Sequence, residues 1–337
     1  MKVIFSHYAP FFLAHGGAQT ITEEIMRGLR NKGIDVEPER WWDENQTGDL
    51  LHYISRPIKS NVLLAKKHGF KTVMTDLLDT VAARSPAKLF LNRAIVRGVT
   101  RFAPGMTDRV AWDVYRELDA MIFSLSHESD VAQYLFAAPP ERCHVMPWGL
   151  RAEAIADLAK PQAEEDYLIS IASIVPRKNT VRLARAAREA QVPILFVGKP
   201  LAHSDDYFRE FESLIDNKLV RYAGFVAEEE KYRLLRGARG FALLSWGESG
   251  CVAAYEAAAA GLPLFLNDAP WARTGYPGAD PIQFAKADAH SGVVSGLRKF
   301  YSSAHRMTRT TFPILSWDQV AERHIALYQQ LLNGKGR

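Results

Sequence analysis

Short apolar runs separated by polar, glycine-bearing loops recur along the chain and predict buried strands of an α/β protein. In the first half these runs occupy residues 3–6, 49–54, 71–75, 120–124 and 144–150. In the second half they occupy residues 167–172, 194–199, 220–226, 241–246 and 264–266. Segments with apolar positions at helical spacing follow several runs, as in residues 20–32 and 180–190. The alternation predicts doubly wound domains with parallel sheets.

The length of the chain indicates two domains. Its 337 residues exceed what one hydrophobic core usually serves. The strand pattern puts a Rossmann-like domain in residues 1–150 and a second one in residues 165–312. Residues 151–166 are polar and alanine-rich, which favours a linker. Residues 313–337 include a predicted closing helix from Ser316 to Leu332.

Composition excludes some classes of function. The chain has 42 basic and 38 acidic residues, and the net charge of +4 is too small to predict nucleic-acid binding. Cys143 and Cys251 have no metal-ligand spacing and indicate free thiols in a reducing compartment. Residues 3–5 already form the first strand, and no apolar stretch is long enough to cross a bilayer. We therefore expect a cytoplasmic protein, with or without peripheral contact at the inner membrane surface.

Several candidate ligand-binding residues lie in residues 247–263, whose sequence is GESGCVAAYEAAAAGLP. A strand ends at Gly247, and Ser249 and Gly250 are predicted to open a helix of small residues. The start of a helix carries a partial positive charge and unpaired N–H groups, so it suits a phosphate. Gly261 and Pro263 end the helix.

Two acidic residues lie in this stretch, eight positions apart. Glu248 follows the strand and could accept hydrogen bonds from sugar hydroxyls. Glu256 lies in the small-residue helix and could accept both hydroxyls of a ribose. The alternative is that Glu256 is a solvated helix residue, which its apolar surroundings disfavour because a buried carboxylate needs partners.

Arg177 and Lys178 follow the first strand of the second domain. A guanidinium can hold a diphosphate with two parallel hydrogen bonds, and an ammonium adds a compact charge. The alternative is a pair of solvated loop cations. Further along, residues 227–237 read as a solvent-facing helix with acidic residues before basic ones.

In the first domain, Gly16 and Gly17 lie in the loop after the first strand, where glycine lets a ligand approach the backbone or simply permits a turn. The loop lacks the three spaced glycines of a dinucleotide site, so NAD is not expected. Asp76 follows the third apolar run and reads equally as an acceptor-side acid or a helix cap. His127 follows a later strand and is either a proton-transfer residue or structural.

Residues 80–107 carry basic residues without one acidic residue. Apolar residues alternate with them at roughly helical spacing. This pattern predicts an amphipathic helix whose basic face is either merely solvated or binds an anionic acceptor or phospholipid surface. The basic residues are Arg84, Lys88, Arg93, Arg97 and Arg101.

The two glutamates, the small residues after them and the Gly-x-Pro ending resemble the donor-site signature of retaining GT-B glycosyltransferases of family four. The resemblance implies two Rossmann-like domains facing across a cleft, with a C-terminal helix crossing back. It also implies that Glu248 contacts the donor sugar and Glu256 the ribose. Ser249, Gly250 and Cys251 stand where the family commonly has Phe-Gly-Leu, which leaves the sugar preference open.

The resemblance assigns further donor contacts. Arg177 and Lys178 would neutralise the leaving diphosphate, and Gly16 and Gly17 would face it from the other domain. Residues 224–226 resemble the turn that binds the base, which makes Phe225 and Val226 donor contacts. Asp76 stands where the family commonly has a histidine.

The function implied is a retaining, metal-independent transfer of a sugar from a nucleoside diphosphate sugar, linked to UDP or GDP, as in polysaccharide biosynthesis. The acceptor would be a glycan, a lipid-linked molecule or a small molecule, and no cofactor is expected. Two alternatives stay open: a nucleotide-sugar-binding protein without transfer activity, and a GT-B sugar-nucleotide epimerase. Product analysis with the donor alone separates them.

Overall fold

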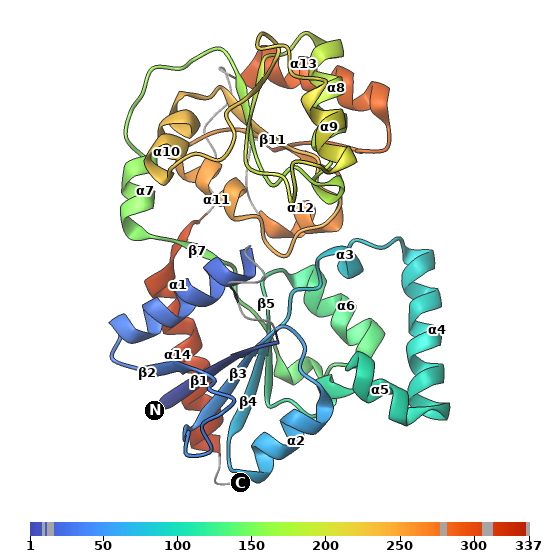
Figure 1. The fold of residues 1–337 in the computed structure, drawn as a ribbon, viewed down its shortest axis with the longest axis vertical. Coiled ribbons are helices and arrows are strands. Elements are labelled where there is room, and N and C mark those ends of the chain that lie inside the picture. Colours follow the sequence, from blue (N-terminus) through green and yellow to red (C-terminus); the bar gives the residue numbers. More distant parts are fainter. Residues whose placement is uncertain (9–10, 12–16, 277–281, 305–312, 335–337) are drawn as a thin grey trace. The chain divides into compact units, whose positions relative to one another are not determined.

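A computed structural model describes residues 1–8, 11, 17–276, 282–304 and 313–334 of the chain. The chain forms two compact units (Figure 1). Unit 1 comprises residues 1–149 and 315–337, and unit 2 comprises residues 150–314. No helix among the described residues has the length and apolar character needed to cross a membrane.

Unit 1 contains a six-stranded parallel sheet of order β2-β1-β3-β4-β5-β6. The central strands are short apolar runs that are buried on both faces, as parallel sheets require. The strands are β1 (Lys2–His7), β2 (Asp35–Pro38), β3 (Leu50–Ile54), β4 (Lys71–Thr75), β5 (Ala120–Phe123) and β6 (Cys143–Val145).

Helices surround the strands of unit 1, some of them packed on the sheet and others on neighbouring helices (Figure 1). They are α1 (Gly17–Asn31), α2 (Lys59–Lys67), α3 (Asp79–Ala82), α4 (Pro86–Phe102), α5 (Pro104–Val110), α6 (Ser126–Phe136) and α14 (Trp317–Asn333), with single turns at Val114–Arg116 and Pro140–Arg142. The predicted helix of residues 80–107 is thus three helices, because Pro86 and Pro104 each begin a new one.

Helix α14 belongs to unit 1 although it ends the chain. Ser316 and Gln319 form a capping box at its start. The helix packs on α1, where a Cβ on Gly28 would lie 2.9 Å from the Cβ of Ala321. Close approach also explains Gly149 in β7 (Gly149–Leu150), which pairs with β14 (Leu315–Ser316): a Cβ there would lie 2.7 Å from the backbone nitrogen of Trp317.

Unit 2 contains a second six-stranded parallel sheet, of order β10-β9-β8-β11-β12-β13. Its strands are β8 (Leu168–Ile171), β9 (Ile194–Val197), β10 (Val220–Tyr222), β11 (Gly240–Leu243), β12 (Leu264–Asn267) and β13 (Ile282–Ala285). Its helices are α7 (Ala152–Leu158), α8 (Thr180–Ala190), α9 (Asp206–Glu212), α10 (Glu228–Gly237), α11 (Val252–Ala259), α12 (Pro270–Gly275) and α13 (His290–Ala304), with a single turn at Pro176–Lys178.

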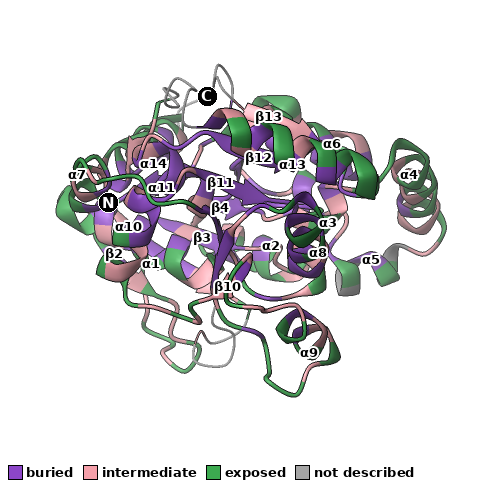
Figure 2. Ribbon diagram, turned by 90° about the horizontal axis from the view of Figure 1, so that it is seen from above, coloured by how far each residue is buried: buried purple, intermediate pink, exposed green. Residues whose placement is uncertain are grey.

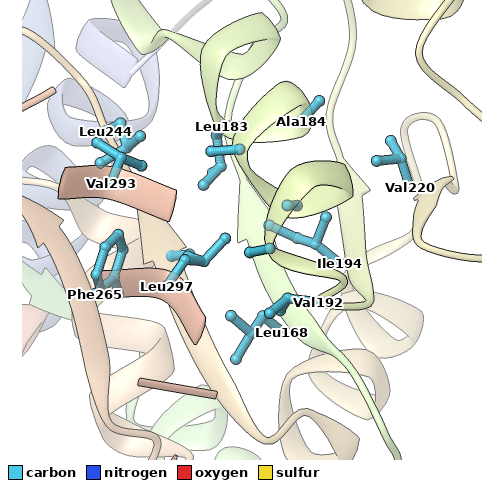
Figure 3. Packing of buried hydrophobic residues seen from close by; sticks show 14 of the residues in the cluster. Leu168, Leu183, Ala184, Val192, Ile194, Val220, Leu244, Phe265, Val293 and Leu297 are labelled. Carbon is cyan, nitrogen blue, oxygen red and sulfur yellow. The ribbon is translucent and has the colours of Figure 1, made fainter. Parts of the chain in front are cut away.

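The core of unit 2 lies where α8 and α13 pack on the sheet (Figure 3). Leu183 of α8 and Leu297 of α13 are fully buried, as are Ile194 and Phe265 on strands of the sheet. The central strands of both sheets are coloured as buried in Figure 2, whereas α4 is mostly exposed or intermediate. The large buried area makes the sheet of unit 2 a rigid base for the loops at its edge.

Two predictions of organisation need correction. Residues 151–166 are not simply a linker, because they contain α7, whose Ala154 and Leu158 are buried. The prediction also missed β2 and β13. Both are edge strands of four residues with polar positions, so their apolar signal is weak.

Candidate functional site

The predicted cations and the first glutamate lie at the carboxyl ends of neighbouring strands of unit 2. Strand β8 pairs with β11, and from this point the strand order runs outward in both directions, through β9 to β10 and through β12 to β13. Parallel sheets leave a crevice for ligands where the order reverses. The loop after β8 carries Arg177 and Lys178, and the loop after β11 carries Glu248.

These three side chains form a cluster. The Lys178 ammonium lies 2.6 and 2.7 Å from the two carboxylate oxygens of Glu248. An Arg177 guanidinium nitrogen donates to the carbonyl of Gly247 at 2.5 Å and lies 3.4 Å from Oε2 of Glu248. The side chains of Glu248 and Lys178 are 7% and 15% exposed, and that of Arg177 is 31% exposed. Two cations thus surround one buried carboxylate, and the alternative of two solvated loop cations does not describe them.

Two hydrogen bonds to backbone carbonyls hold the two loops together. The amide of Trp246 donates to the carbonyl of Arg177 at 2.9 Å. Asn179, in the left-handed conformation at φ 60°, donates through Nδ2 to the carbonyl of Leu244 at 3.3 Å. Each loop therefore fixes the other, and the cationic groups have a defined position before any ligand binds.

A second pair of contacts fixes the loop after β11 from its other side. Asn267 at the end of β12 and Trp271 on α12 both donate to the carbonyl of Ser245, at 2.9 and 3.1 Å. All three residues are buried. Moving a buried carbonyl away from two hydrogen-bond donors costs free energy, so these contacts keep the loop in place.

The helix after this loop begins later than the sequence suggested. Residue Cys251, not Ser249, occupies the N-cap position of α11, and its side chain makes no capping hydrogen bond. Gly250 has φ 77°, so it makes the turn that Ser249 and Gly250 were expected to form as the start of the helix. Burial raises the pKa of the Cys251 thiol to about 12, so the residue is a neutral, inert part of the turn.

The second glutamate has a partner that sequence reasoning missed. Glu256 is 5% exposed and lies 2.6 Å from the ammonium of Lys231 on α10. Burial raises the pKa of the Glu256 carboxyl, and the charge of Lys231 opposes part of that rise. The prediction of a solvent-facing helix at residues 227–237 is wrong on this side, where Tyr232 and Leu235 are also buried. Glu256 is therefore not a solvated helix residue.

The predicted base-binding turn follows β10. Gly224 has φ 72°, and its carbonyl accepts from the amide of Gly198 at 2.9 Å. Phe225 is 75% exposed, with the ammonium of Lys199 5.3 Å from its ring centre. Val226 is half-buried. The turn is thus an exposed aromatic surface on well-fixed backbone.

In unit 1 the predicted glycine pair is described only at Gly17. Gly16 lies outside the described residues. Gly17 is the first residue of α1 and is exposed, so it belongs to the helix and not to the loop. A glycine at the first helical position leaves the backbone approachable, as a loop glycine would.

Asp76 is a buried residue 3% exposed. It accepts a hydrogen bond from the hydroxyl of Tyr115, and the guanidinium of Arg56 lies 3.6 Å away. The interpretation as a helix cap is wrong: Leu78 occupies the N-cap position of α3, and its amide donates to Glu128 at 2.9 Å. Asp76 therefore fixes Arg56 and Tyr115.

His127 has a structural contact. Its Nε2 donates to the carbonyl of Ala82 at 2.8 Å, and the side chain is half-buried. This bond ties α6 to α3. The structural interpretation of His127 accounts for the contact without proton transfer.

Unit 1 has a cavity of about 470 Å³ that the sequence analysis did not find. It lies where β1 and β3 are neighbours and the strand order of this sheet reverses. It is lined by Ser6, His7, Tyr8, Glu39, Trp41, Tyr53, Ile54, Ser55, Arg56, Pro57, Ile58 and Asn61. These residues lie in the last positions of β1 and β3 or in the segments that follow β1, β2 and β3. Polar or aromatic residues at those positions are the signal that could have found the site.

Aromatic rings and one carboxylate dominate this cavity. Trp41 is 70% exposed, and its indole nitrogen donates to Oε2 of Glu39 at 3.1 Å. The hydroxyl of Ser6 donates to the same oxygen at 2.5 Å. The hydroxyl of Tyr53 is buried and has no hydrogen-bond partner among the described residues. Such a group is available to a ligand that enters the cavity.

The family model for glycosyl transferases group 1 matches residues 153–274. This segment contains both loops of the ionic cluster and helices α10 and α11. No curated protein matches the chain.

Solved structures match over nearly the whole chain. The Alr3699/HepE protein of Anabaena, in complex with UDP and glucose, is 15% identical with a TM-score of 0.63, covering 99% of each chain. Sucrose-phosphate synthase from Thermosynechococcus elongatus is 14% identical with a TM-score of 0.66, covering 99% of this chain and 100% of its own. WaaG, a glycosyltransferase involved in lipopolysaccharide biosynthesis, is 16% identical with a TM-score of 0.57, covering 99% of this chain and 100% of its own.

Proposed function

We propose that this chain transfers a sugar from a nucleoside diphosphate sugar to an acceptor hydroxyl, from the premise that it is a group 1 glycosyltransferase with the GT-B fold. That family and that fold are what the sequence predicted, and the comparisons confirm both. The observation that carries the proposed reaction is the cluster of Arg177, Lys178 and Glu248 at the reversal of strand order in unit 2. It lies within the segment that the family model matches.

The two cations would stabilise the leaving group. Transfer breaks the bond between the anomeric carbon and an oxygen of the diphosphate, and negative charge grows on the diphosphate as it leaves. An ammonium has three N–H donors, and Lys178 can direct two of them at Glu248 and the third at a phosphate oxygen. Arg177 is exposed enough to reach a ligand. Donors fixed in advance stabilise the transition state more than the ground state.

The two glutamates would hold the donor at its two ends. Glu248 positions Lys178 and could accept from hydroxyls of the sugar. Glu256 would accept from the ribose hydroxyls, since Lys231 favours its charged form against the effect of burial. Phe225 is an exposed ring of the kind on which a base can stack. UDP is bound in the HepE structure, which favours a uridine donor over a guanosine one.

We propose that the acceptor binds in the cavity of unit 1. Sugars present flat C–H faces to aromatic rings and hydroxyls to carboxylates, and Trp41 and Glu39 offer one of each. A glycan, lipid-linked or small acceptor that ends in a sugar would fit this chemistry. Retention at the anomeric carbon and independence of metal ions follow from the family resemblance and are part of the proposal, as is peripheral contact with a membrane.

Turnover of donor sugars by the purified protein tests the proposal. Arg177→Ala or Lys178→Ala should lower donor hydrolysis and transfer several hundredfold, because losing one fixed donor to a developing charge costs about 3 kcal/mol of transition-state stabilisation. Arg185→Ala is the matched control, since Arg185 is an exposed cation that pairs with Glu210 on nearby helices. Rates of the cation variants equal to those of Arg185→Ala would refute the diphosphate role.

The same measurement separates the alternatives. A binding protein without transfer activity would show melting-temperature shifts with UDP or GDP sugars but no release of nucleoside diphosphate. An epimerase would convert the donor sugar without releasing the nucleotide. If the release of nucleoside diphosphate rises when an acceptor is added, the result supports transfer and neither of the two alternatives.

A further inference from the structure

The cavity of unit 1 is lined by two residues with hydrogen-bond donors that the protein itself leaves unused. The hydroxyl of Tyr53 is buried and has no partner among the described residues, and the same holds for Nε of Arg56. Burial raises the pKa of the Tyr53 hydroxyl, so the group keeps its proton at neutral pH and can donate it in a hydrogen bond. An unpaired buried donor costs free energy unless a water molecule or a ligand meets it.

The chain between these two residues has an uncommon conformation. Ser55 has φ 70°, in the left-handed region that residues with a side chain rarely adopt. Its amide donates to the carbonyl of Thr75 at 2.8 Å, which fixes the bend to the end of β4. Conformations of this kind cluster at ligand sites, where the surrounding structure stabilises them. Here the bend lies between Tyr53 and Arg56, both of which line the cavity.

The side chain of Arg56 is held in place. Its guanidinium lies over the rings of Phe136 and Tyr115, 4.4 and 5.1 Å from the ring centres. Asp76 is 3.6 Å away, which is longer than a hydrogen bond, and the same oxygen of Asp76 accepts from the hydroxyl of Tyr115. Asp76 does not line the cavity, whereas the Arg56 side chain does and is 20% exposed. A fixed guanidinium with unused donors is suited to an oxyanion.

A carboxylate also lines the cavity. Oε2 of Glu39 accepts from the hydroxyl of Ser6 at 2.5 Å and from the indole nitrogen of Trp41 at 3.1 Å. An ionised carboxylate has about four lone-pair sites, so Glu39 can accept further hydrogen bonds from the hydroxyls of a sugar. It would repel a second anion, which favours Arg56 as the place for a negative group. The cavity therefore suits a molecule that carries both hydroxyls and one negative charge.

We propose that the acceptor is an acidic sugar, whose carboxylate or phosphate group binds Arg56 and the hydroxyl of Tyr53 while its hydroxyls bind Glu39. This inference rests on the proposed function, in which the acceptor occupies this cavity. A planar guanidinium binds a carboxylate or a phosphate with two parallel hydrogen bonds. A neutral sugar would leave the donors of Arg56 unpaired. A cationic sugar would meet Glu39 but would be repelled by Arg56.

Calorimetry with matched sugars tests the proposal. Glucose, galactose and mannose are each compared with their uronic acid and their 6-phosphate, so that the ring is the same within a set. At least one acid should bind roughly tenfold to hundredfold more tightly than its neutral parent, the range for hydrogen bonds to a charged group. Preference for a uronic acid identifies a carboxylate, and preference for a 6-phosphate identifies a phosphate. If no acid binds more tightly than its parent, the proposal is wrong.

Variants assign the preference to Arg56. Arg56→Gln should remove it, and Arg56→Lys should restore part of it, because the ammonium keeps the charge but not the planar fork. Arg56→Gln leaves Asp76 without its cation, so the double variant with Asp76→Asn, which removes both charges, serves if the single variant does not fold. Tyr53→Phe should reduce the preference roughly twofold to tenfold, because one donor is lost.

Lys67→Gln is the matched control, because Lys67 is an exposed cation of α2 that does not line the cavity. It should keep the preference of the native protein. If the double variant of Arg56 and Asp76 keeps the same preference as Lys67→Gln, Arg56 does not bind the anion and the proposal is overturned. It is also overturned if inorganic phosphate binds as tightly as the 6-phosphates, because the cavity then takes a free anion and does not recognise the sugar.

Donor hydrolysis without an acceptor, measured on the same samples, keeps this test separate from the transfer reaction. Hydrolysis together with equal binding of acids and neutral parents would overturn the acidic acceptor and leave sugar transfer standing. Preferential binding of an acid without donor hydrolysis would support the anion site and count against transfer.

Discussion

Both units place their candidate sites where the strand order of a parallel sheet reverses, but the residues at the two sites differ in kind. Each sheet is parallel and six-stranded, and each reverses its strand order once, between β1 and β3 in unit 1 and between β8 and β11 in unit 2. In unit 2 the loops at the reversal carry ionised groups in contact, with Lys178 and Glu248 at 2.6 Å. In unit 1 they border a cavity lined by exposed aromatic rings, the carboxylate of Glu39 and Arg56, whose guanidinium lies 3.6 Å from Asp76.

The difference indicates which kind of ligand each unit can take. Fixed cations are useful where charge develops, as on a leaving diphosphate. Rings and a carboxylate suit a molecule with many hydroxyls. The fold supplies the place for a ligand in both units, and the residues after each strand decide its chemistry.

Lowering the pH should destabilise unit 1 more than unit 2. Unit 1 buries His52 and His324 completely, and burial lowers the pKa of both, that of His324 to about 4. The unfolded chain takes up a proton near pH 6.5 whereas folded His324 does not, so the free energy of unfolding falls as pH drops from about 6.5 to 4. The loss from His324 alone is about 3 kcal/mol. His203 and His290 of unit 2 are exposed.

Hydrogen exchange of separate peptides measures this loss. Between pH 6.5 and 4, peptides from β3 and α14 should lose protection before peptides from β8 and β11, after correction for the intrinsic pH dependence of exchange. In His324→Phe the loss should shrink, because phenylalanine does not titrate and Nε2 of His324 has no hydrogen-bond partner among the described residues. Equal loss of protection in the two units would contradict the argument.

A variant of Glu256 tests whether the charged site of unit 2 binds the nucleotide. Glu256→Gln keeps the size of the side chain and removes its charge, so UDP binding should weaken by about 1.5–3 kcal/mol, the range for hydrogen bonds to a charged group. This corresponds to roughly a tenfold to hundredfold rise in Kd by calorimetry. Glu229→Gln, an exposed position on α10, is the control. An unchanged Kd would remove Glu256 from the donor site.

The sequence predicted the parts of the fold that depend on local patterns. Most strands are apolar runs of four to six residues, and their order along the chain already indicated parallel sheets. The sequence analysis predicted ligand-binding residues in the loop of Arg177 and Lys178 and in the loop of Glu248, because each loop follows such a run. Edge strands β2 and β13 were missed, since half-exposed residues give no such pattern.

Contacts between distant segments could not be predicted in the same way. Lys231 of α10 lies 2.6 Å from Glu256 of α11, and no periodicity in either helix specifies that pair. The partners of Asp76 likewise come from two other segments, at Arg56 and at Tyr115 in the turn Val114–Arg116. The start of α11 was misplaced because a serine is a favoured N-cap, while here Gly250 makes the turn at Ser249 and the helix begins beyond Cys251.

A variant of Trp41 tests whether the aromatic cavity of unit 1 binds the sugar acceptor. Trp41→Ala removes an exposed ring from the cavity of unit 1, and an aromatic contact of this kind is worth about 1 kcal/mol, so the KM for a sugar acceptor should rise about fivefold. Donor hydrolysis without an acceptor should not change, because the ionic cluster of unit 2 is intact. Trp42→Ala is a close control: Trp42 is the next residue, is 86% exposed and is not among the residues that line the cavity. Titration with methyl hexopyranosides, followed by calorimetry, gives the binding constant directly. If both variants bind these sugars equally, the acceptor site lies elsewhere, and the aromatic cavity is no counterpart to the charged loops of unit 2.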